Sequence, residues 1–578
     1  MAGEPFEPTG DLPKSARLSF YTPLLPYFLA LMFACIVAGT FCLREYSNAF
    51  LAVGSASILL EITLRFFASI FSDEKENLAK QYLLLGLRFV GIFLACIWYF
   101  YFRVDANPYK NFAPREATIT VEIDEVSRGA NDSRYGVAHI ISAPYFLKNA
   151  KGHKVWYTIS DGKNSTSENK NITVSQVVKL TGIFASVYPD EVKARGHFSA
   201  KPESRAFEKY LNERFIYFKI NSRVANAQIL ENAKSRFKYF EQVRRYMEKS
   251  LASFWRDNAE DDEASKVYRA MILGDKSLLT KEQKRSYMDT GTMHVFAISG
   301  LHIGFATAVL FGILSALRLN WRIQPLFALP MLYLYVCACG SRPSALRAFA
   351  FVAFVWCALS LSRGMKPFGA LVLSAFIFLL ISPSYIFDAG FVLSYAIVAS
   401  IFVYSVPLYN YISYKIFQRI ELDEISKAQR FLRWLIVYFL GAFCISLGAL
   451  FVGAPLSAHY FSFIAPMSIL YSPFFVSGAG IAVGLGFAGF LLPDFIARCF
   501  NEVAVVLVGM MSDFAVWGAN IWSGRIDFSM PSTQLSFVAV LGFLFISANM
   551  IRKRSAFFRF VLAPIFVMLI MLINLFYA

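Results

Sequence analysis

Long apolar segments recur along this chain of 578 residues, and they constrain its fold more than any other feature of the sequence. A helix needs about 20 apolar residues to cross the hydrocarbon layer of a membrane, and 56% of the residues here are hydrophobic. We therefore predict a polytopic α-helical membrane protein with about 13 spans. The apolar segments run approximately over 24–43, 49–71, 82–102, 293–317, 324–340, 345–362, 367–382, 391–409, 434–453, 466–490, 499–521, 534–550 and 560–577.

A polar stretch with short alternating apolar residues separates the first three apolar segments from the others. Ile119, Val121 and Ile123 illustrate the alternation, and a period of two residues is typical of half-buried strands. We predict a small all-β domain over residues 113–222, inserted into the membrane protein and folded as an OB-like barrel of about five strands.

Barrels of the OB type bind single-stranded nucleic acid through a basic groove and aromatic side chains. The stretch contains more basic than acidic residues, and Trp156, Tyr157 and Tyr188 are candidate stacking residues. The same charge is equally compatible with a solvated surface, so both interpretations stay open.

The hydrophobic period becomes helical from Val224 to Phe254, where apolar residues recur every three or four positions. The opposite face is basic and includes Arg244, Arg245 and Lys249. A basic amphipathic helix with aromatic residues on its apolar face is typical of a membrane interface, and we favour that position. Packing on the barrel and contact with a phosphate backbone are the alternatives.

The segment that begins at Asp289 opens the second series of apolar segments, yet it contains polar residues that a lipid-facing helix would lack. Polar groups at membrane depth are costly and usually face a watery cavity or a path. We predict that this segment lines a path, and the alternative is a histidine-capped helix entrance with glycines for close packing. The candidate path residues are His294, Ser299, Gly300, His302 and Gly304.

Two later clusters are further candidates for contacts along the same path. Arg342 and Arg347 are suited to phosphate, because a guanidinium stays charged and donates two parallel hydrogen bonds; snorkelling to an interface is the alternative, above all for Arg342. Asp388, Ser394 and Tyr395 follow. We expect Asp388 mainly to cap the helix after it, and the other two to bond or stack along the path.

Several of these segments resemble the signature of the ComEC family of competence proteins, which are inner-membrane channels for transforming DNA. The first is Met271-Ile272-Leu273-Gly274-Asp275, followed by Gly291-Thr292-Met293-His294 and by Ile298-Ser299-Gly300-Leu301-His302. The segments 342–347 and 382–395 are similar to two further family blocks, and 202–211 resembles the end of the family's OB-like domain. A final block departs from the family pattern, since Ser468 stands where we expect Asn.

The resemblance implies a channel that conducts single-stranded DNA into the cytoplasm during natural transformation. It divides the chain into residues 1–112, an N-terminal membrane region with about three spans; 113–222, the OB-like domain; 223–290, the basic amphipathic helix with connecting helices; and 291–578, a competence-type transmembrane domain. Many family members also carry a metallo-β-lactamase-like domain, but this sequence contains no His-x-His-x-Asp-His run. We expect a short form that lacks this domain.

We also expect no catalytic residues, no metal and no cofactor, because the sequence has no nucleophile elbow and no phosphate-binding loop of a nucleotide motor. The partners implied are single-stranded DNA, membrane lipids and a separate nuclease, DNA receptor and cytoplasmic motor. A second copy of this chain is a further candidate partner.

Loop charges give an orientation. The most basic loops, such as 415–433 and 552–559, fall on one side if the spans alternate from a cytoplasmic N-terminus, as the positive-inside bias requires. The barrel is then extracytoplasmic in a multi-pass protein of the bacterial inner membrane. Two other functions remain open: a transporter or flippase for another anionic substrate, and a membrane-embedded hydrolase that uses Ser299 with a histidine.

Overall fold

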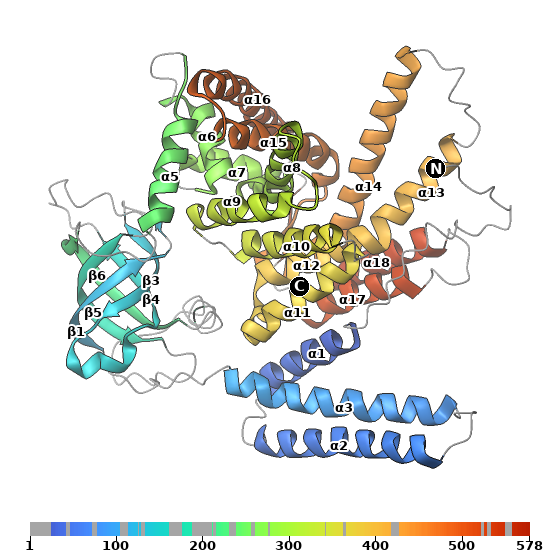
Figure 1. Ribbon diagram of the computed structural model, residues 1–578. Helices are drawn as coiled ribbons and strands as arrows, with labels where there is room; N and C mark the ends of the chain where they lie inside the picture. Colours follow the sequence, from blue (N-terminus) through green and yellow to red (C-terminus); the bar gives the residue numbers. More distant parts are fainter. Residues whose placement is uncertain are drawn as a thin grey trace.

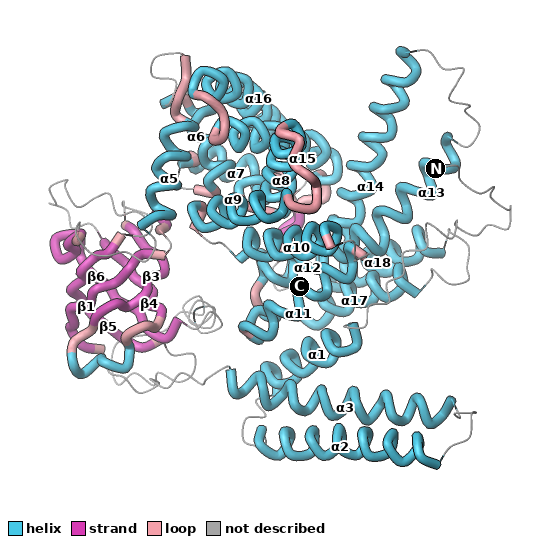
Figure 2. The backbone as a smooth tube through the Cα atoms, viewed as in Figure 1, coloured by secondary structure: helices cyan, strands magenta, loops and turns pink. Residues whose placement is uncertain are grey.

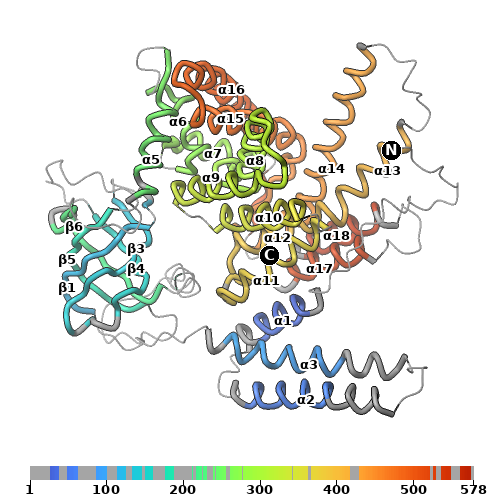
Figure 3. The backbone as a smooth tube through the Cα atoms, viewed as in Figure 1, coloured from blue at the N-terminus to red at the C-terminus, as the bar shows by residue number. Residues whose placement is uncertain are grey.

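Helices make up most of the chain in the computed structural model, and one small β domain stands apart from them (Figure 1; Figure 2). Figure 3 shows how the chain passes from the N-terminal helices through the β domain into the larger helical region. The structure describes residues 25–41, 47–71, 78–103, 114–124, 126–128, 133–160, 176–187, 211, 216–230, 238–255, 261–275, 278–340, 343–361, 366–417, 427–521, 525–528, 533–549 and 558–577.

Three N-terminal helices form the first unit: α1 (Leu25–Phe41), α2 (Ser47–Phe71) and α3 (Leu78–Arg103). Helices α2 and α3 cross closely, since a Cβ on Gly54 would lie 2.8 Å from the carbonyl oxygen of Gly91. Arg88 of α3 donates to the buried Glu61 of α2 over 2.8 Å. A shared core that includes Leu31 joins this unit to the larger helical region.

Six strands form the β domain: β1 (Arg115–Ile123), β2 (Ser127–Arg128), β3 (Arg134–Ser142), β4 (Lys154–Ser160), β5 (Val177–Ser186) and β6 (Ile216–Ile229). A short helix, η4 (Tyr145–Ala150), lies between β3 and β4. The order is β1-β5-β6-β4-β3-β2, and β1 also pairs with β3, so five strands close into a barrel.

Two details give the barrel its OB-like topology. Strands β4 and β6 are parallel, whereas the other pairs are antiparallel. The register of β1 shifts between Thr120 and Val121, and such a bulge bends a strand so that it can pair on both sides of a barrel. Val121, Val155 and Phe218 fill the interior. The prediction of a small five-stranded OB-like barrel is confirmed.

The two described stacking candidates are less available than we predicted. Tyr157 is completely buried in the barrel core, so that its ring cannot stack on a base. Trp156 is half-buried against a cluster that contains Leu211, and its ring lies 5.6 Å from that of Tyr135. Tyr188 is outside the described residues.

The helix expected from Val224 to Phe254 begins later and faces protein. Strand β6 continues to Ile229, which pairs with Val178 of β5. The hydrogen bonds of this strand pairing stabilise the extended backbone more than the local helix propensity stabilises a helix. Helix α5 (Lys238–Leu251) follows. Its apolar face is buried in the large helical core at Met247 and Leu251. Our preference for a membrane interface on that face is therefore wrong.

The larger helical region contains α6 to α18, with two short strands and four short 3-10 or π-helical turns between them. Its first helices are α6 (Glu263–Leu273), α7 (Lys281–Asp289), η8 (Met293–Phe296), α8 (Gly300–Ala316), α9 (Gln324–Ala338), α10 (Pro343–Ser360) and α11 (Pro367–Ile381). The next are η9 (Pro383–Phe387), α12 (Ala389–Ser400), a π-helical turn η10 (Ile401–Ser405), α13 (Val406–Phe417) and α14 (Lys427–Phe461). The last are β7 (Phe463–Ile464), α15 (Ser468–Gly489), α16 (Asp494–Ile521), β8 (Ile526–Asp527), α17 (Thr533–Asn549), η12 (Phe558–Leu562) and α18 (Ala563–Tyr577).

Five helices in the described part of the chain are long and apolar enough to cross a membrane: Pro343–Ser360, Ala389–Ile416, Ala428–Phe461, Ser468–Gly489 and Asp494–Asn520. Eight further apolar helices have 10–17 residues and correspond to the other predicted segments. The protein is thus a mostly helical membrane protein, but our number of about 13 spans is not confirmed.

Candidate functional site

Ser299 and His302 together begin helix α8. The Ser299 hydroxyl accepts a bond of 3.3 Å from the backbone N–H of Leu301, and the backbone N–H of Ser299 donates to Nδ1 of His302 over 3.3 Å. This is a reciprocal capping box in which histidine takes the position usually held by Glu or Gln. The local pattern of Ser followed three residues later by a side-chain acceptor therefore fixes where α8 starts.

His302 also joins α8 to the end of α6. Its side chain is completely buried, and Nε2 lies 3.1 Å from the carbonyl oxygen of Met271. A neutral ring with its proton on Nε2 satisfies both contacts. The hydroxyl of Tyr335 on α9 donates to the next carbonyl, that of Ile272, over 2.9 Å. Gly274 then ends α6 at a φ of 69°, which glycine adopts without strain.

The remaining residues of this segment lie on its outer side. His294 is exposed, and its Nδ1 lies 3.1 Å from the carbonyl oxygen of Gly291. Gly291 itself has a φ of +70°, and a Cβ there would lie 2.9 Å from the Cβ of Ser468. Gly300 and Gly304 are exposed, and a Cβ on Gly304 would meet no described atom within 4 Å.

Helix α10 connects this segment with the start of α12. The Ser344 hydroxyl donates to the carbonyl oxygen of Ile298 over 2.7 Å. One turn further along α10, Nη2 of Arg347 donates to the carbonyl oxygen of Gly390 over 2.8 Å. The three segments that we selected from the sequence thus meet around the first turns of α10.

Arg347 is a buried cation, with only 3% of its side chain exposed. Its guanidinium carbon lies 5.7 Å from the ring centroid of Phe391 and 6.0 Å from that of Tyr395. Among the described residues its Nε has no hydrogen-bond partner. A buried charged group with an unfilled donor is costly, and such groups inside membrane proteins often mark a substrate pathway.

Asp388 caps α12, as we predicted, by accepting a bond of 2.8 Å from the backbone N–H of Phe391. The hydroxyl of Tyr395 donates to Ser374 of α11 over 3.2 Å. Ser394 is half-buried on α12. Arg342 lies outside the described residues, so its prediction cannot be compared with the structure.

The arrangement gathers positive electrostatic potential in one place. Helices α8, α10 and α12 all begin near Arg347, through the bonds of Ser344 and Arg347 just described. Each helix N-terminus carries a partial positive charge, and the guanidinium adds a full one, whereas the Asp388 carboxylate that caps α12 offsets part of the positive charge there. This combination favours a phosphate-bearing ligand.

The geometry gives less support to serine chemistry. The Ser299 hydroxyl lies 3.2 Å from Nδ1 of His302, which is within reach for proton transfer. However, the other ring nitrogen contacts a backbone carbonyl, whereas serine hydrolases orient this nitrogen with a carboxylate. Asp289, the nearest candidate in sequence, bonds to two arginines instead.

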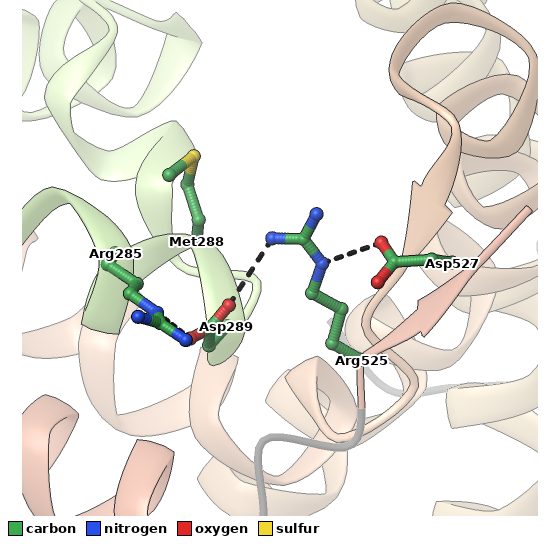
Figure 4. Close-up of a pocket in the computed structure, with 5 residues that line it drawn as sticks. All are labelled: Arg285, Met288, Asp289, Arg525 and Asp527. Atoms are coloured by element: carbon green, nitrogen blue, oxygen red, sulfur yellow. Dashed lines mark hydrogen bonds and ion pairs between the residues drawn. The ribbon is translucent and has the colours of Figure 1, made fainter.

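An open cavity of about 570 Å³ lies beside the end of α7, where the segment begins (Figure 4). Arg525 reaches across it, with bonds of 3.4 Å to Asp289 and 2.8 Å to Asp527. The hydrogen bond to Asp527 is the main cause that raises the pKa of Arg525 above its ordinary value. Arg285 approaches the other oxygen of Asp289 at 3.7 Å.

Sequence reasoning missed Tyr335, Arg525 and Asp527. Tyr335 sits in an apolar run like any core tyrosine, and no local signal shows that its hydroxyl reaches Ile272. Arg525 precedes the two-residue strand β8 and Asp527 is its second residue, and the pairing of β8 with β7 is a long-range contact. The Ser-x-x-His capping box was readable from the sequence by analogy with Ser-x-x-Gln.

Comparisons with known proteins give one family. Residues 271–531 match the family model described as "Competence protein". ComE operon protein 3 of Bacillus subtilis (strain 168) is 36% identical over 140 residues, and the match covers 24% of this chain and 18% of the relative.

Two further relatives carry no functional name. The "Uncharacterized protein YcaI" of Escherichia coli (strain K12) is 30% identical over 143 residues, covering 23% of this chain and 19% of that protein. An uncharacterized protein of Aquifex aeolicus (strain VF5) is 25% identical over 304 residues, covering 50% of this chain and 64% of that protein. No solved structure matches the chain.

Proposed function

This chain carries a domain of the competence protein family at residues 271–531, and on that premise we propose that it is a channel that conducts single-stranded DNA across the bacterial inner membrane during natural transformation. The similarity to a protein of the ComE operon supports the same process. The strand enters the cytoplasm, and a separate nuclease, DNA receptor and motor act with the channel.

The buried guanidinium of Arg347 is the observation that carries the proposal. Its Nε donor has no partner among the described residues, and the N-termini of α8, α10 and α12 lie around it, of which that of α12 is capped by the Asp388 carboxylate. A passing phosphate would accept from the free donor and be attracted by the helix ends. Because a single strand presents a phosphate at every nucleotide, one such site can act repeatedly without binding the polymer tightly.

The barrel supports a role in receiving the strand. Its OB-like topology is one that binds oligonucleotides in other proteins. A shallow hollow of about 370 Å³ on its outer side is lined only by polar side chains, namely Glu116, Thr118, Lys179, Thr181, Asn226 and Gln228. We place the barrel outside the cytoplasm, where incoming DNA arrives, on the basis of the loop charges.

We further propose that the chain is not an enzyme. His302 acts as a structural link between α6 and α8, because its two nitrogens already contact Ser299 and Met271. Membrane lipids are the partners that surround the helical region. Among the described residues, no three His, Cys, Asp or Glu side chains are grouped so that they could hold a metal ion.

The test is uptake of labelled DNA into the cytoplasm of a competent host that lacks the chain. Complementation with the wild type should restore uptake, whereas Arg347→Ala should reduce it at least about tenfold, since a charged hydrogen bond to phosphate is lost. Arg347→Lys keeps the charge but loses the planar fork and should give an intermediate rate. Membrane levels of each variant are compared by immunoblot.

Two outcomes would contradict the proposal. Normal cytoplasmic uptake in the deletion strain would remove DNA as the substrate and leave a transporter or flippase of another phosphate-bearing substrate as the leading function. Normal uptake with well-inserted Arg347→Ala would show that this site does not contact the strand.

A further inference from the structure

The outward face of α5 carries an unusual row of side chains. We define the α5 stripe as Tyr239, Gln242, Arg245, Tyr246 and Lys249. Successive positions along the stripe are three or four residues apart, with Arg245 and Tyr246 side by side, so all five lie on one face of the helix. All are exposed, and the two tyrosines expose 78% and 54% of their surface. The opposite face is fixed, because Met247 and Leu251 are buried in the helical core.

Tyr246 is held in place although its ring is exposed. Its hydroxyl donates to the carbonyl oxygen of Phe490, at the turn between α15 and α16, over 3.0 Å. The residues that follow α5 contact the first turns of α16: Ser253 donates to Asp494 over 2.9 Å, and Arg498 lies 5.2 Å above the ring of Trp255. Trp255 is also 58% exposed. The exposed rings of Tyr246 and Trp255 therefore lie beside the turn between α15 and α16 and the first turns of α16.

The chemistry of the α5 stripe differs from that of a lipid-facing surface. On α14, by contrast, Phe431, Leu432 and Ile436 are exposed apolar side chains of the kind that suits contact with acyl chains. The α5 stripe has no aliphatic side chain, and each member can form hydrogen bonds. Two of the five are cationic and none is acidic, so the stripe complements a polyanion that also presents flat rings.

We propose that the α5 stripe binds single-stranded nucleic acid, with bases stacked on Tyr239 and Tyr246 and phosphates beside Arg245 and Lys249. Single-strand binding proteins combine these two contacts, and each stacked base contributes to affinity independently of sequence. This inference rests on the proposed function, because it names the surface by which the strand passes from the barrel to the helical domain. The position fits: α5 follows β6 of the barrel, and Figure 1 shows it between the barrel and the other helices.

The experiment uses the full chain in lipid nanodiscs and fluorescein-labelled oligo(dT), with binding followed by fluorescence anisotropy. Tyr239→Ala/Tyr246→Ala should weaken binding by roughly tenfold or more, as expected for the loss of stacking. Tyr239→Phe/Tyr246→Phe keeps the rings and should bind within about twofold of the wild type. Lys249→Met should reduce the slope of log affinity against log salt by about 0.7, the value for one phosphate contact on a single strand.

Trp434→Ala on α14 is the matched control, because this exposed aromatic residue lies in a stack with Phe431 and Tyr438 on a surface of lipid-facing type. It should leave oligo(dT) binding unchanged. Thermal unfolding confirms that each variant is folded.

The outcomes separate this inference from the proposed function. If cellular DNA uptake requires the chain but the double Ala variant binds oligo(dT) normally, the α5 stripe does not bind the strand. The proposed channel function is unaffected by that result. If the double Ala variant instead loses binding to vesicles that contain anionic lipid and keeps oligo(dT) binding, the surface contacts lipid headgroups and the inference is overturned. If the wild-type chain neither supports cellular DNA uptake nor binds oligo(dT), the proposed function itself is wrong.

Discussion

At the scale of single residues, His302 shows how a polar residue at membrane depth can serve the fold. Its ring connects the N-terminus of α8 with the C-terminus of α6, and both contacts go to backbone groups that would otherwise lack partners. Helix ends leave such groups unsatisfied, and in a buried site they must be bonded within the protein. The role of His302 is therefore to set the distance between α6 and α8.

We predict that His302→Ala destabilises the protein by about 2 kcal/mol or more, because two buried backbone groups lose their partner. His302→Gln should recover part of this loss, since glutamine at the same position completes a capping box. The measurement is the unfolding midpoint of the purified chain in detergent. His294→Ala is the control: His294 is exposed and has a single bond to Gly291, so its loss should matter little. Equal midpoints for His302→Ala and the wild type would refute the structural role.

At the scale of elements, the sequence predicted those features that depend on residues within one helical turn of each other. The position of Asp388 before an apolar run predicted an N-cap, and the bond to Phe391 confirms it. The bond between Arg347 and Gly390 joins residues 43 apart, and no local pattern determines which helix packs against α10. The same limit explains the end of β6, where pairing with β5 decided the fold against the helical pattern.

The glycines of α15 give an element-scale prediction of close packing. A Cβ on Gly480 would lie 2.3 Å from the ring of Phe305 on α8, whereas a Cβ on Gly484, one turn later, would lie 3.7 Å from the same ring. Gly480→Ala should therefore destabilise the protein by about 1–3 kcal/mol through overpacking. Gly484→Ala should be neutral or stabilise by up to about 1 kcal/mol, because alanine has the higher helix propensity.

The pair is measured by thermal unfolding in detergent, and each variant is the control for the other. Both lie on the same helix and face the same partner, so a difference between them reports the distance to Phe305. Equal stabilities would show that α8 and α15 pack less closely than the distance of 2.3 Å at Gly480 implies.

At the scale of the whole molecule, α16 joins parts that are far apart in the sequence. Near one end, Asn501 accepts from Tyr268 of α6 over 3.0 Å and donates to the carbonyls of Ser250 in α5 and Ser253 just after it. Further along, Ser512 lies 2.9 Å from the hydroxyl of Tyr287 on α7. The segment that follows the barrel, from α5 to α7, thus packs along α16.

Arg525 completes this connection beyond the C-terminal end of α16, and its bond to Asp289 yields the last prediction. Asp289 ends α7, exposes 15% of its side chain and bonds to Arg525, which exposes 33%. For a partly exposed pair we expect a coupling energy of about 1 kcal/mol from a double-mutant cycle of Asp289→Asn and Arg525→Gln. Asp527 exposes 67% of its side chain, so the matched cycle with Asp527→Asn should give about 0.5 kcal/mol or less.

Unfolding in detergent at low and high salt is the measurement, and salt should weaken both couplings. A coupling near zero at low salt for Asp289 with Arg525 would mean that α7 and β8 are not tied by this ion pair.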